Sequence, residues 1–225
     1  MIEKFIQSLK KKPTDSLFNP WYETDQEHDL TADAPLIRRR QLTAYLAERQ
    51  KSAKYLFIAE ALGYQGGHFT GIAMTSERIL LGHQKESYGV GPDDVFKSIE
   101  PNRTSNPEVN DRGMTEPTAT IMWGALKDLG INPYEVVLWN AVPWHPYKPE
   151  KGLLSNRTPL REEMDAGLIL LESFLKLFPN AERVAVGRKC EESLHQLGEE
   201  YIGVRHPANG GAPKFRKQLQ NLSGN

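Results

Sequence analysis

The chain lacks the defining features of several protein classes. It has 225 residues and a single cysteine, Cys190, so it has no internal disulfide and no cysteine cluster for zinc or an iron–sulfur centre. No stretch approaches the roughly 20 apolar residues of a membrane-spanning helix. The first residues, MIEKFIQSLKKK, contain no long apolar core of a secretory signal. We therefore expect a cytoplasmic protein that needs no metal or other cofactor.

An excess of charge of one sign is also missing. The 28 Lys and Arg residues nearly balance the 29 Asp and Glu residues, and the formal net charge is -1. Any contact with nucleic acid must therefore come from a local basic patch. We expect the basic runs KKK (10–12) and RRR (38–40) to be solvated faces. Hydrophobic residues make up 39% of the chain, which is enough for the core of one α/β domain, and we expect a monomer.

Short apolar runs alternate with helical patterns along most of the chain. We predict strands at 54–60, 135–139, 183–187 and 201–204, and helices at 2–11, 35–50, 74–82, 117–130, 158–179, 188–198 and 212–222. Continuous apolar strands separated by helices are typical of a parallel sheet that is covered on both faces. The sequence therefore predicts an α/β fold, a three-layer α/β/α sandwich with a central four-stranded parallel sheet.

Two segments interrupt this alternation. Residues 1–35 are polar and rich in turns, and we interpret them as an N-terminal arm, either packed or mobile, that precedes a domain at 36–225. Residues 83–116 are irregular, so they form either a functional flap or a mobile insertion. At the later helix we expect Thr158 as the N-cap and Pro159 as the first helical residue.

Polar residues follow three of the predicted strands, at Glu60, Asn140 and His206. Ligands of open parallel sheets bind outside the carboxyl ends of the strands, so these side chains point to one site. The amide of Asn140 matches the edge of a planar amide such as a pyrimidine, or it caps the turn before Pro143. A neutral His206 can donate to a developing anion, or it only ties its own loop together.

Two glycine-containing loops flank this edge of the sheet. In EALGYQGGHFTG (60–71) the glycines permit a close approach of the backbone, and Tyr64, His68 and Phe69 either line a pocket or serve as ordinary loop and core residues. A GxGxxG dinucleotide fingerprint is absent. In RHPANGGAPKFR (205–216) a protruding turn precedes a helix that carries Lys214, Arg216 and Lys217. This basic cluster either holds phosphate or is a solvated helix face.

Together these segments resemble the uracil-DNA glycosylase superfamily. AEALGYQGGHFTG resembles its first motif, particularly the GEAPG form of the iron–sulfur branch. LWNAVPWHP resembles the strand-end Asn segment, and RHPANGGAPKFRKQL resembles the His-Pro motif with its DNA-intercalating loop. The resemblance spans about residues 54–220. It implies a four-stranded parallel sheet and an enzyme of base-excision repair, a DNA glycosylase that cleaves the N-glycosidic bond of a flipped uracil or related damaged base in DNA.

The resemblance also implies residue roles. Asn140 reads the Watson–Crick edge of the base and His206 stabilises the departing base anion. Glu60 orients water or stabilises charge on the sugar, or it instead fixes the loop by accepting backbone amides. The residues implied to line the base pocket are Ala61, Leu62, Gly63 and Tyr64, with Phe69 stacking on the base. Those implied to contact DNA are Pro207, Ala208, Asn209, Gly210, Lys214 and Arg216.

The chain departs from the family pattern at several positions, and these departures leave alternatives open. Ala59 and Leu62 replace the Gly and Pro of GEAPG, and Ala61 stands where the most active branch carries its catalytic Asp. Gly63 stands where that branch carries a Tyr that excludes thymine, so we expect a larger or 5-substituted base to enter. The alternatives are a non-catalytic nucleic-acid-binding member of the fold, an enzyme for another deaminated base such as hypoxanthine or for a free nucleoside, and a flavodoxin-like phosphate binder.

Overall fold

Four parallel strands form the central sheet of residues 1–222, which are the residues that the computed structural model describes. They are β2 (Tyr55–Ala61), β3 (Val136–Val142), β5 (Glu182–Val186) and β6 (Ile202–Val204), in the spatial order β3-β2-β5-β6. Every residue of β3 is buried, as expected for a strand that is covered on both faces. The predicted strands and their parallel arrangement are confirmed.

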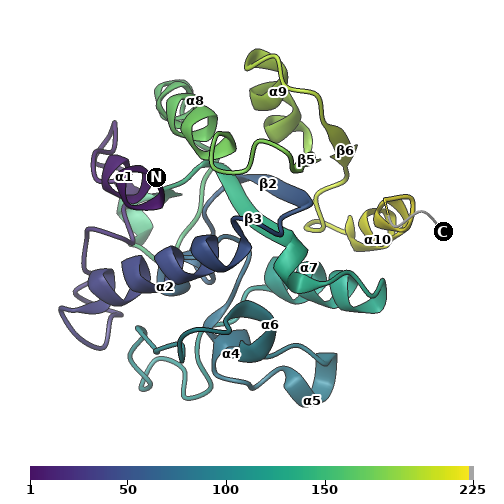
Figure 1. Ribbon diagram of the computed structural model, residues 1–225. Coiled ribbons are helices and arrows are strands. Elements are labelled where there is room, and N and C mark those ends of the chain that lie inside the picture. The colour runs from purple at the N-terminus through teal and green to yellow at the C-terminus, as the bar shows by residue number, and fades with distance from the viewer. Residues whose placement is uncertain (223–225) are drawn as a thin grey trace.

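Helices cover both faces of this sheet (Figure 1). The helices α8 (Arg161–Leu175) and α9 (Arg188–Gln196) lie on one face, and α2 (Ala34–Arg49), α7 (Pro117–Asp128) and α10 (Ala212–Gln220) lie on the other. The predicted three-layer sandwich is therefore confirmed. Among the described residues, no helix combines the length and the apolar character needed to cross a membrane.

The segment 83–116 is mostly irregular, as predicted, but it is packed against the body of the molecule. Short helices α3 (Gly67–Thr70), α4 (Glu77–Leu80), α5 (Lys85–Tyr88) and α6 (Pro92–Val95) lead into and through it. The buried carboxylate of Glu77 accepts hydrogen bonds from the backbone N–H groups of Thr104 and Ser105 at 2.7 and 3.0 Å. These bonds anchor the segment to α4, because a buried carboxylate needs such donors.

The arm 1–35 is packed, which decides between the two states expected for it. Its helix α1 (Ile2–Ser8) places the ring of Phe5 5.4 Å from that of Trp139 on β3. Its strand β1 (Leu17–Phe18) pairs with β4 (His145–Pro146) in a small antiparallel sheet that sequence analysis missed. The division of the chain after residue 35 stays a prediction, although the arm shares one hydrophobic core with the remainder.

Two local predictions are wrong. Arg38 does not belong to a solvated face, because its side chain is fully buried and forms an ion pair with Asp29 at 2.6 Å. Thr158 does not cap α8 and Pro159 does not begin it, because the helix starts at Arg161, three residues after Thr158. Instead the Glu163 carboxylate accepts the N–H of Leu160 at 2.7 Å, so a carboxylate within the first turn supplies the cap.

Candidate functional site

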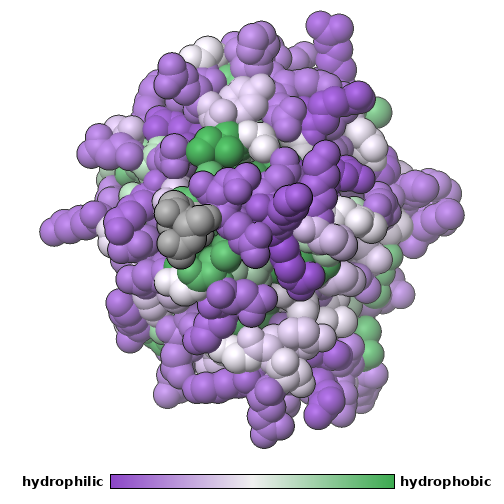
Figure 2. All heavy atoms as spheres, turned by 90° about the vertical axis from the view of Figure 1, so that its right-hand side faces the viewer, coloured by the Kyte–Doolittle hydropathy of each residue, from purple (hydrophilic) through white to green (hydrophobic). Residues whose placement is uncertain are grey.

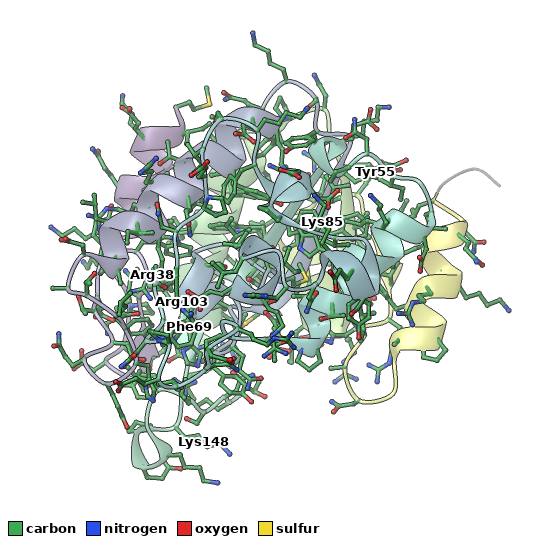
Figure 3. All side chains as sticks on the ribbon, turned by 90° about the horizontal axis from the view of Figure 1, so that it is seen from below. Arg38, Tyr55, Phe69, Lys85, Arg103 and Lys148 are labelled. Atoms are coloured by element: carbon green, nitrogen blue, oxygen red, sulfur yellow. The ribbon has the colours of Figure 1, made fainter. Side chains whose placement is uncertain are left out.

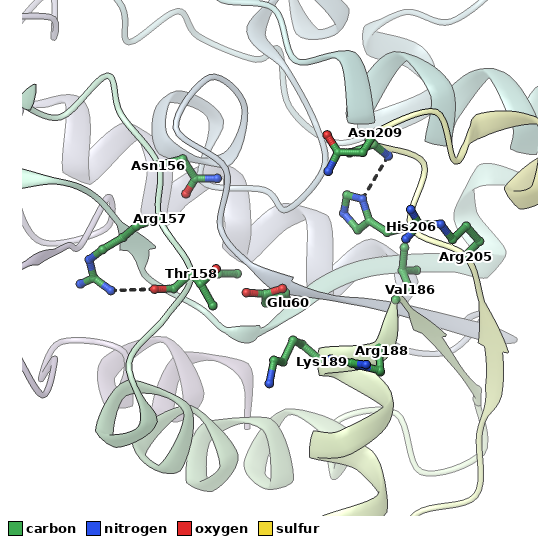
Figure 4. Close-up of a pocket in the computed structure, with 13 residues that line it drawn as sticks. Glu60, Asn156, Arg157, Thr158, Val186, Arg188, Lys189, Arg205, His206 and Asn209 are labelled. Atoms are coloured by element: carbon green, nitrogen blue, oxygen red, sulfur yellow. Dashed lines mark hydrogen bonds between the residues drawn. The ribbon is translucent and has the colours of Figure 1, made fainter.

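A cavity opens at the carboxyl edge of the sheet (Figure 4). Its volume is about 420 Å³, and it lies where β2 and β5 end and where the chain leaves β6. The structure brings Glu60 of β2 and His206, two residues beyond β6, to this one site. Its lining residues are Glu60, Ala61, Asn156, Arg157, Thr158, Val186, Gly187, Arg188, Lys189, Arg205, His206, Ala208 and Asn209.

His206 presents a defined hydrogen-bond donor. The backbone N–H of Ala208 donates to its Nδ1 at 3.1 Å (Figure 4), so a neutral ring carries its proton on Nε2. Burial, and then the charge of Arg205, lower the pKa of His206 below its usual 6.5. The ring is therefore neutral at neutral pH. Gly187 has a φ of 92° and comes so close that a side chain there would press on His206.

Asn140 lies behind the cavity rather than on its wall. It sits opposite Ala59 across the sheet, and its Nδ2 donates to the carbonyl oxygen of Ala61 at 2.9 Å. The side chain is 2% exposed, and within residues 1–222 its Oδ1 atom has no hydrogen-bond partner. Asn140 therefore fixes the end of β2 and keeps one unused acceptor next to Ala61, a lining residue.

Glu60 points its carboxyl group into the cavity between Thr158 and Lys189 (Figure 4). Burial raises the pKa of Glu60, an effect that the charge of Lys189 opposes and that of Glu192 reinforces. No backbone amide in the described part of the chain donates a hydrogen bond to Glu60, so the anchoring role that was one alternative for it is not seen. Its carboxyl group is available to water or to a ligand.

The loop after His206 exposes only its tip. Pro207 is buried, whereas Asn209 and Gly210 are exposed and have φ values of 53° and 72°. Pro207 is therefore not presented to a ligand in this conformation. Lys214 and Arg216 are exposed on α10, and Figure 2 shows that the face on this side of the molecule is mostly hydrophilic, with small separate apolar patches.

The glycine-rich loop contributes less to the cavity than the sequence suggested. Ala61 lines the cavity, but the side chain of Leu62 is 1% exposed and belongs to the hydrophobic core. Gly63 and Tyr64 are half-buried, and the Tyr64 ring stacks near that of His145, with 6.3 Å between centroids. Phe69 is fully buried beside His68 and near Arg38 (Figure 3), so its side chain is not presented to the cavity.

On the far side of this loop lies a set of paired polar side chains, which we call the arm network: Asp25, Asp29, Arg38, His68 and His145. His68 Nε2 lies 3.0 Å from Asp25 Oδ2, and His68 Nδ1 lies 3.1 Å from His145 Nδ1. Arg38 donates to the carbonyl oxygen of His68 at 2.8 Å. The network joins the arm, the glycine-rich loop and β4, and all five side chains are buried.

The two histidine rings of the arm network make more hydrogen-bond contacts than they have N–H groups when both are neutral. His68 contacts Asp25 and His145, and His145 Nε2 contacts the carbonyl oxygen of Ser155 at 2.8 Å. Each of these three contacts needs one N–H, whereas two neutral rings carry only two. Burial, and then the charge of His68, lower the pKa of His145 to about 3. Although burial opposes it, hydrogen bonding to His68 lowers the pKa of Asp25 to about 2. Burial also lowers the pKa of His68, to about 4, although its hydrogen bond to Asp25 opposes this. Both rings are therefore neutral at neutral pH, and one of the three contacts lacks its N–H.

Sequence reasoning missed several lining residues. Arg188 and Lys189 lie two and three residues after the end of β5, so the rule that pointed to the ends of the other strands could have found them. Arg205 carries a guanidinium group with no ion pair or hydrogen bond in the part of the chain that the structure describes. Thr158 was interpreted as a helix N-cap, and Asn156 and Arg157, which precede that helix, gave no signal.

The described residues include no group of three or more His, Cys, Asp or Glu side chains that could hold a metal ion. What the cavity offers is a neutral N–H donor, a free carboxyl group and cationic side chains. This set suits a polar ligand with negative charge around it and a hydrogen-bond acceptor at its centre.

The fold resembles a solved structure. The crystal structure of wild-type SMUG2 from Pedobacter heparinus, a member of the uracil-DNA glycosylase superfamily, matches this chain with a TM-score of 0.58 and 13% sequence identity. The match covers 100% of this chain and 98% of that chain. No protein-family model and no curated protein sequence matches the chain. At this identity the similarity establishes the fold.

Proposed function

We propose that this protein is a DNA glycosylase that cleaves the N-glycosidic bond of an everted uracil or a related damaged base. The observation that carries the proposal is the neutral His206 ring, whose Nε2–H is free to face the same cavity as the Glu60 carboxyl group. Similarity in fold to SMUG2 supports the reaction class. The order of the three sequence motifs supports it independently.

The chemistry follows from where charge develops. When the bond between C1′ of the sugar and the base nitrogen breaks, its electron pair stays with the base, and the sugar becomes cationic. The His206 Nε2–H donates to a carbonyl oxygen of the base as negative charge grows there, which lowers the barrier. The unused Oδ1 of Asn140 accepts a ring N–H of the base and so sets its orientation.

Glu60 completes the hydrolysis. A carboxylate near C1′ stabilises the sugar cation, and it then takes a proton from the water whose oxygen bonds to C1′. Its raised pKa suits the role of a general base near neutral pH. In this proposal Glu60 replaces the carboxylate that the most active branch of the family carries at the position of Ala61.

DNA is held outside the cavity by its backbone. Arg205 and Lys189 stand at the cavity, and Lys214 and Arg216 stand on α10 beyond it. Everting a base from a duplex costs a few kcal/mol, and phosphate contacts offset part of this cost. We place the exposed tip, Asn209 and Gly210, at the position that the base leaves, with Ala208 behind it.

The most direct test is a panel of oligonucleotides that carry uracil or hypoxanthine, single-stranded and paired. We expect the protein to release a free base, which mass spectrometry identifies, and to leave an alkali-labile site. Asn140→Ala combined with His206→Ala should abolish release, whereas His195→Ala on the exposed side of α9 should not change it. Release that survives the double substitution would reject the site.

The panel also separates the other functions. A non-catalytic nucleic-acid-binding protein would bind these oligonucleotides with salt-dependent affinity and release nothing. An enzyme for free nucleosides would act without Lys214 and Arg216, whereas a DNA enzyme would lose affinity when they are removed. The unpaired Glu60 carboxyl in the cavity favours hydrolysis over binding alone.

A further inference from the structure

A second carboxyl group, that of Glu116, lies against the glycine-rich loop, although Glu116 belongs to none of the three sequence motifs. Glu116 precedes α7, and its side chain does not cap that helix. It lies over two glycines instead: a Cβ atom at Gly66 would stand 1.7 Å from Glu116 Oε2, and one at Gly63 would stand 3.2 Å from Oε1. Residue 66 must therefore be glycine for the carboxyl group to occupy this place.

The carboxyl group of Glu116 has no partner. Its Oε2 atom is buried and, within residues 1–222, accepts no hydrogen bond. Burial alone raises the pKa of Glu116 to about 7. The buried carboxylate of Glu77 has the opposite surroundings, because it accepts backbone N–H groups from Thr104, Ser105 and Met114. A buried polar atom without a partner is rare and unfavourable, so the arrangement calls for a ligand.

The position of Glu116 ties it to the proposed base site. Gly63 follows Ala61 by two residues, and Ala61 both lines the cavity and accepts the amide of Asn140. A base oriented by Asn140 would lie against residues 61–63. The space beside Gly63 that a side chain at that position would fill is occupied by the Glu116 carboxyl group.

We propose that Glu116 determines specificity by closing the base pocket beside Gly63 and by exchanging a hydrogen bond with the edge of the base that faces it. This inference rests on the proposed function. It reverses the expectation that Gly63 admits a 5-substituted pyrimidine, because the missing side chain leaves no free space. The preferred substrates are bases with a hydrogen atom and a polar group at that edge, such as uracil, rather than bases with a methyl group there.

Two substitutions separate size from hydrogen bonding. Glu116→Ala opens the space, so we expect the release of thymine relative to uracil, each opposite guanine, to rise at least about tenfold, the effect of one methyl group in a tight pocket. Glu116→Gln keeps the volume, so the same ratio should stay within about twofold of wild type. Glu108→Gln, on the exposed part of the 83–116 segment, is the control. Glu116→Ser replaces Glu116→Ala if the latter does not fold.

Equal ratios in wild type and Glu116→Ala would overturn the inference while leaving the glycosylase function intact. If the wild-type protein releases no base from any oligonucleotide, the proposed function fails, and equilibrium dialysis with free uracil and free thymine decides the role of Glu116. A preference for uracil that Glu116→Ala removes would still support it. No binding of either base, or the same preference in both proteins, would overturn it.

Discussion

The polar side chains on the two sides of the glycine-rich segment 58–71 differ in how they are paired. On the arm side, Arg38, His68 and Asp25 are buried and each has a hydrogen-bond or ion partner, although the Nε atom of Arg38 has none within residues 1–222. Beside Ala61 and Gly63, Asn140 and Glu116 each bury an oxygen that has no hydrogen-bond partner within residues 1–222. The arm network is thus mostly satisfied, whereas the two oxygens beside Ala61 and Gly63 are not. Because folding alone favours satisfied groups, and because Ala61 lines the cavity, we interpret these two oxygens as acceptors or donors for a ligand.

The largest expected effect is a loss of stability caused by a substitution in the arm network. Asp29→Asn removes the negative charge of the buried ion pair with Arg38 and leaves a guanidinium charge without its partner. We expect a loss of about 3–5 kcal/mol of unfolding free energy, measured by urea denaturation. Base release by the protein that remains folded should keep its rate and its preference among bases. A stable variant with lost activity would place the arm network in the site.

The next largest effect is a loss of activity caused by a substitution at the cavity. His206→Gln should lower the rate of base release by about 10²–10³, the usual effect of losing one donor to a developing anion, and should change stability little. Because the pKa of His206 is lowered below 6.5, its ring is neutral across neutral pH and wild-type activity should hold there. Activity should fall at more acidic pH, where Glu60, whose pKa is raised by burial, becomes protonated and cannot accept a proton from water. Single-turnover rates at several pH values measure both. An unchanged rate in the variant would remove His206 from the mechanism.

Glu116 should make the free energy of unfolding depend on pH. Its pKa in the folded protein is about 7, against 4.5 in the ordinary carboxyl group, so the folded state keeps a proton that the unfolded chain has released. Wild-type stability should therefore fall by up to about 3 kcal/mol as pH rises from 4.5 to 7. Glu116→Gln should lack this part of the pH dependence. Urea denaturation across this range compares the two proteins, and parallel curves would show that Glu116 ionises normally.

The smallest effect concerns DNA affinity. Arg205→Ala and Lys214→Ala should each weaken binding to any sequence and reduce the slope of log affinity against log salt by about one, as expected for the loss of one phosphate contact. Lys4→Ala, on the exposed face of α1, is the matched control. Fluorescence anisotropy at several salt concentrations measures the slopes. Slopes equal to that of the control would show that DNA binds to another face of the protein.

The fold was largely predictable because its signals are local. Continuous apolar runs such as 136–142 identify strands that are covered on both faces, and the intervening helices impose parallel pairing. The pairing of β1 with β4 was not predictable, since each strand has two residues and no pattern that distinguishes it from a turn. The burial of Arg38 was hidden for a related reason: its partner Asp29 lies in the irregular arm.

The candidate site was predictable to the extent that it follows strand ends. Glu60 and His206 were found in this way, and Asn140 was found although it lies behind the wall. Glu116 was not found, because it reaches the loop from a segment about 50 residues further along the chain. Phe69 illustrates the opposite case, since a glycine-rich neighbourhood suggested an accessible ring and packing buried it.

One measurement tests most directly whether unpaired polar groups mark the ligand site. Two buried side-chain amides provide matched reporters in ¹H–¹⁵N NMR spectra: Asn140 has an unused oxygen, whereas Gln41 has partners on both its nitrogen and its oxygen. On titration with free uracil and an abasic-site duplex, we predict a large shift of the Asn140 amide and of the Ala208 backbone N–H, and none at Gln41. Shifts at Gln41 with none at Asn140 would contradict the account.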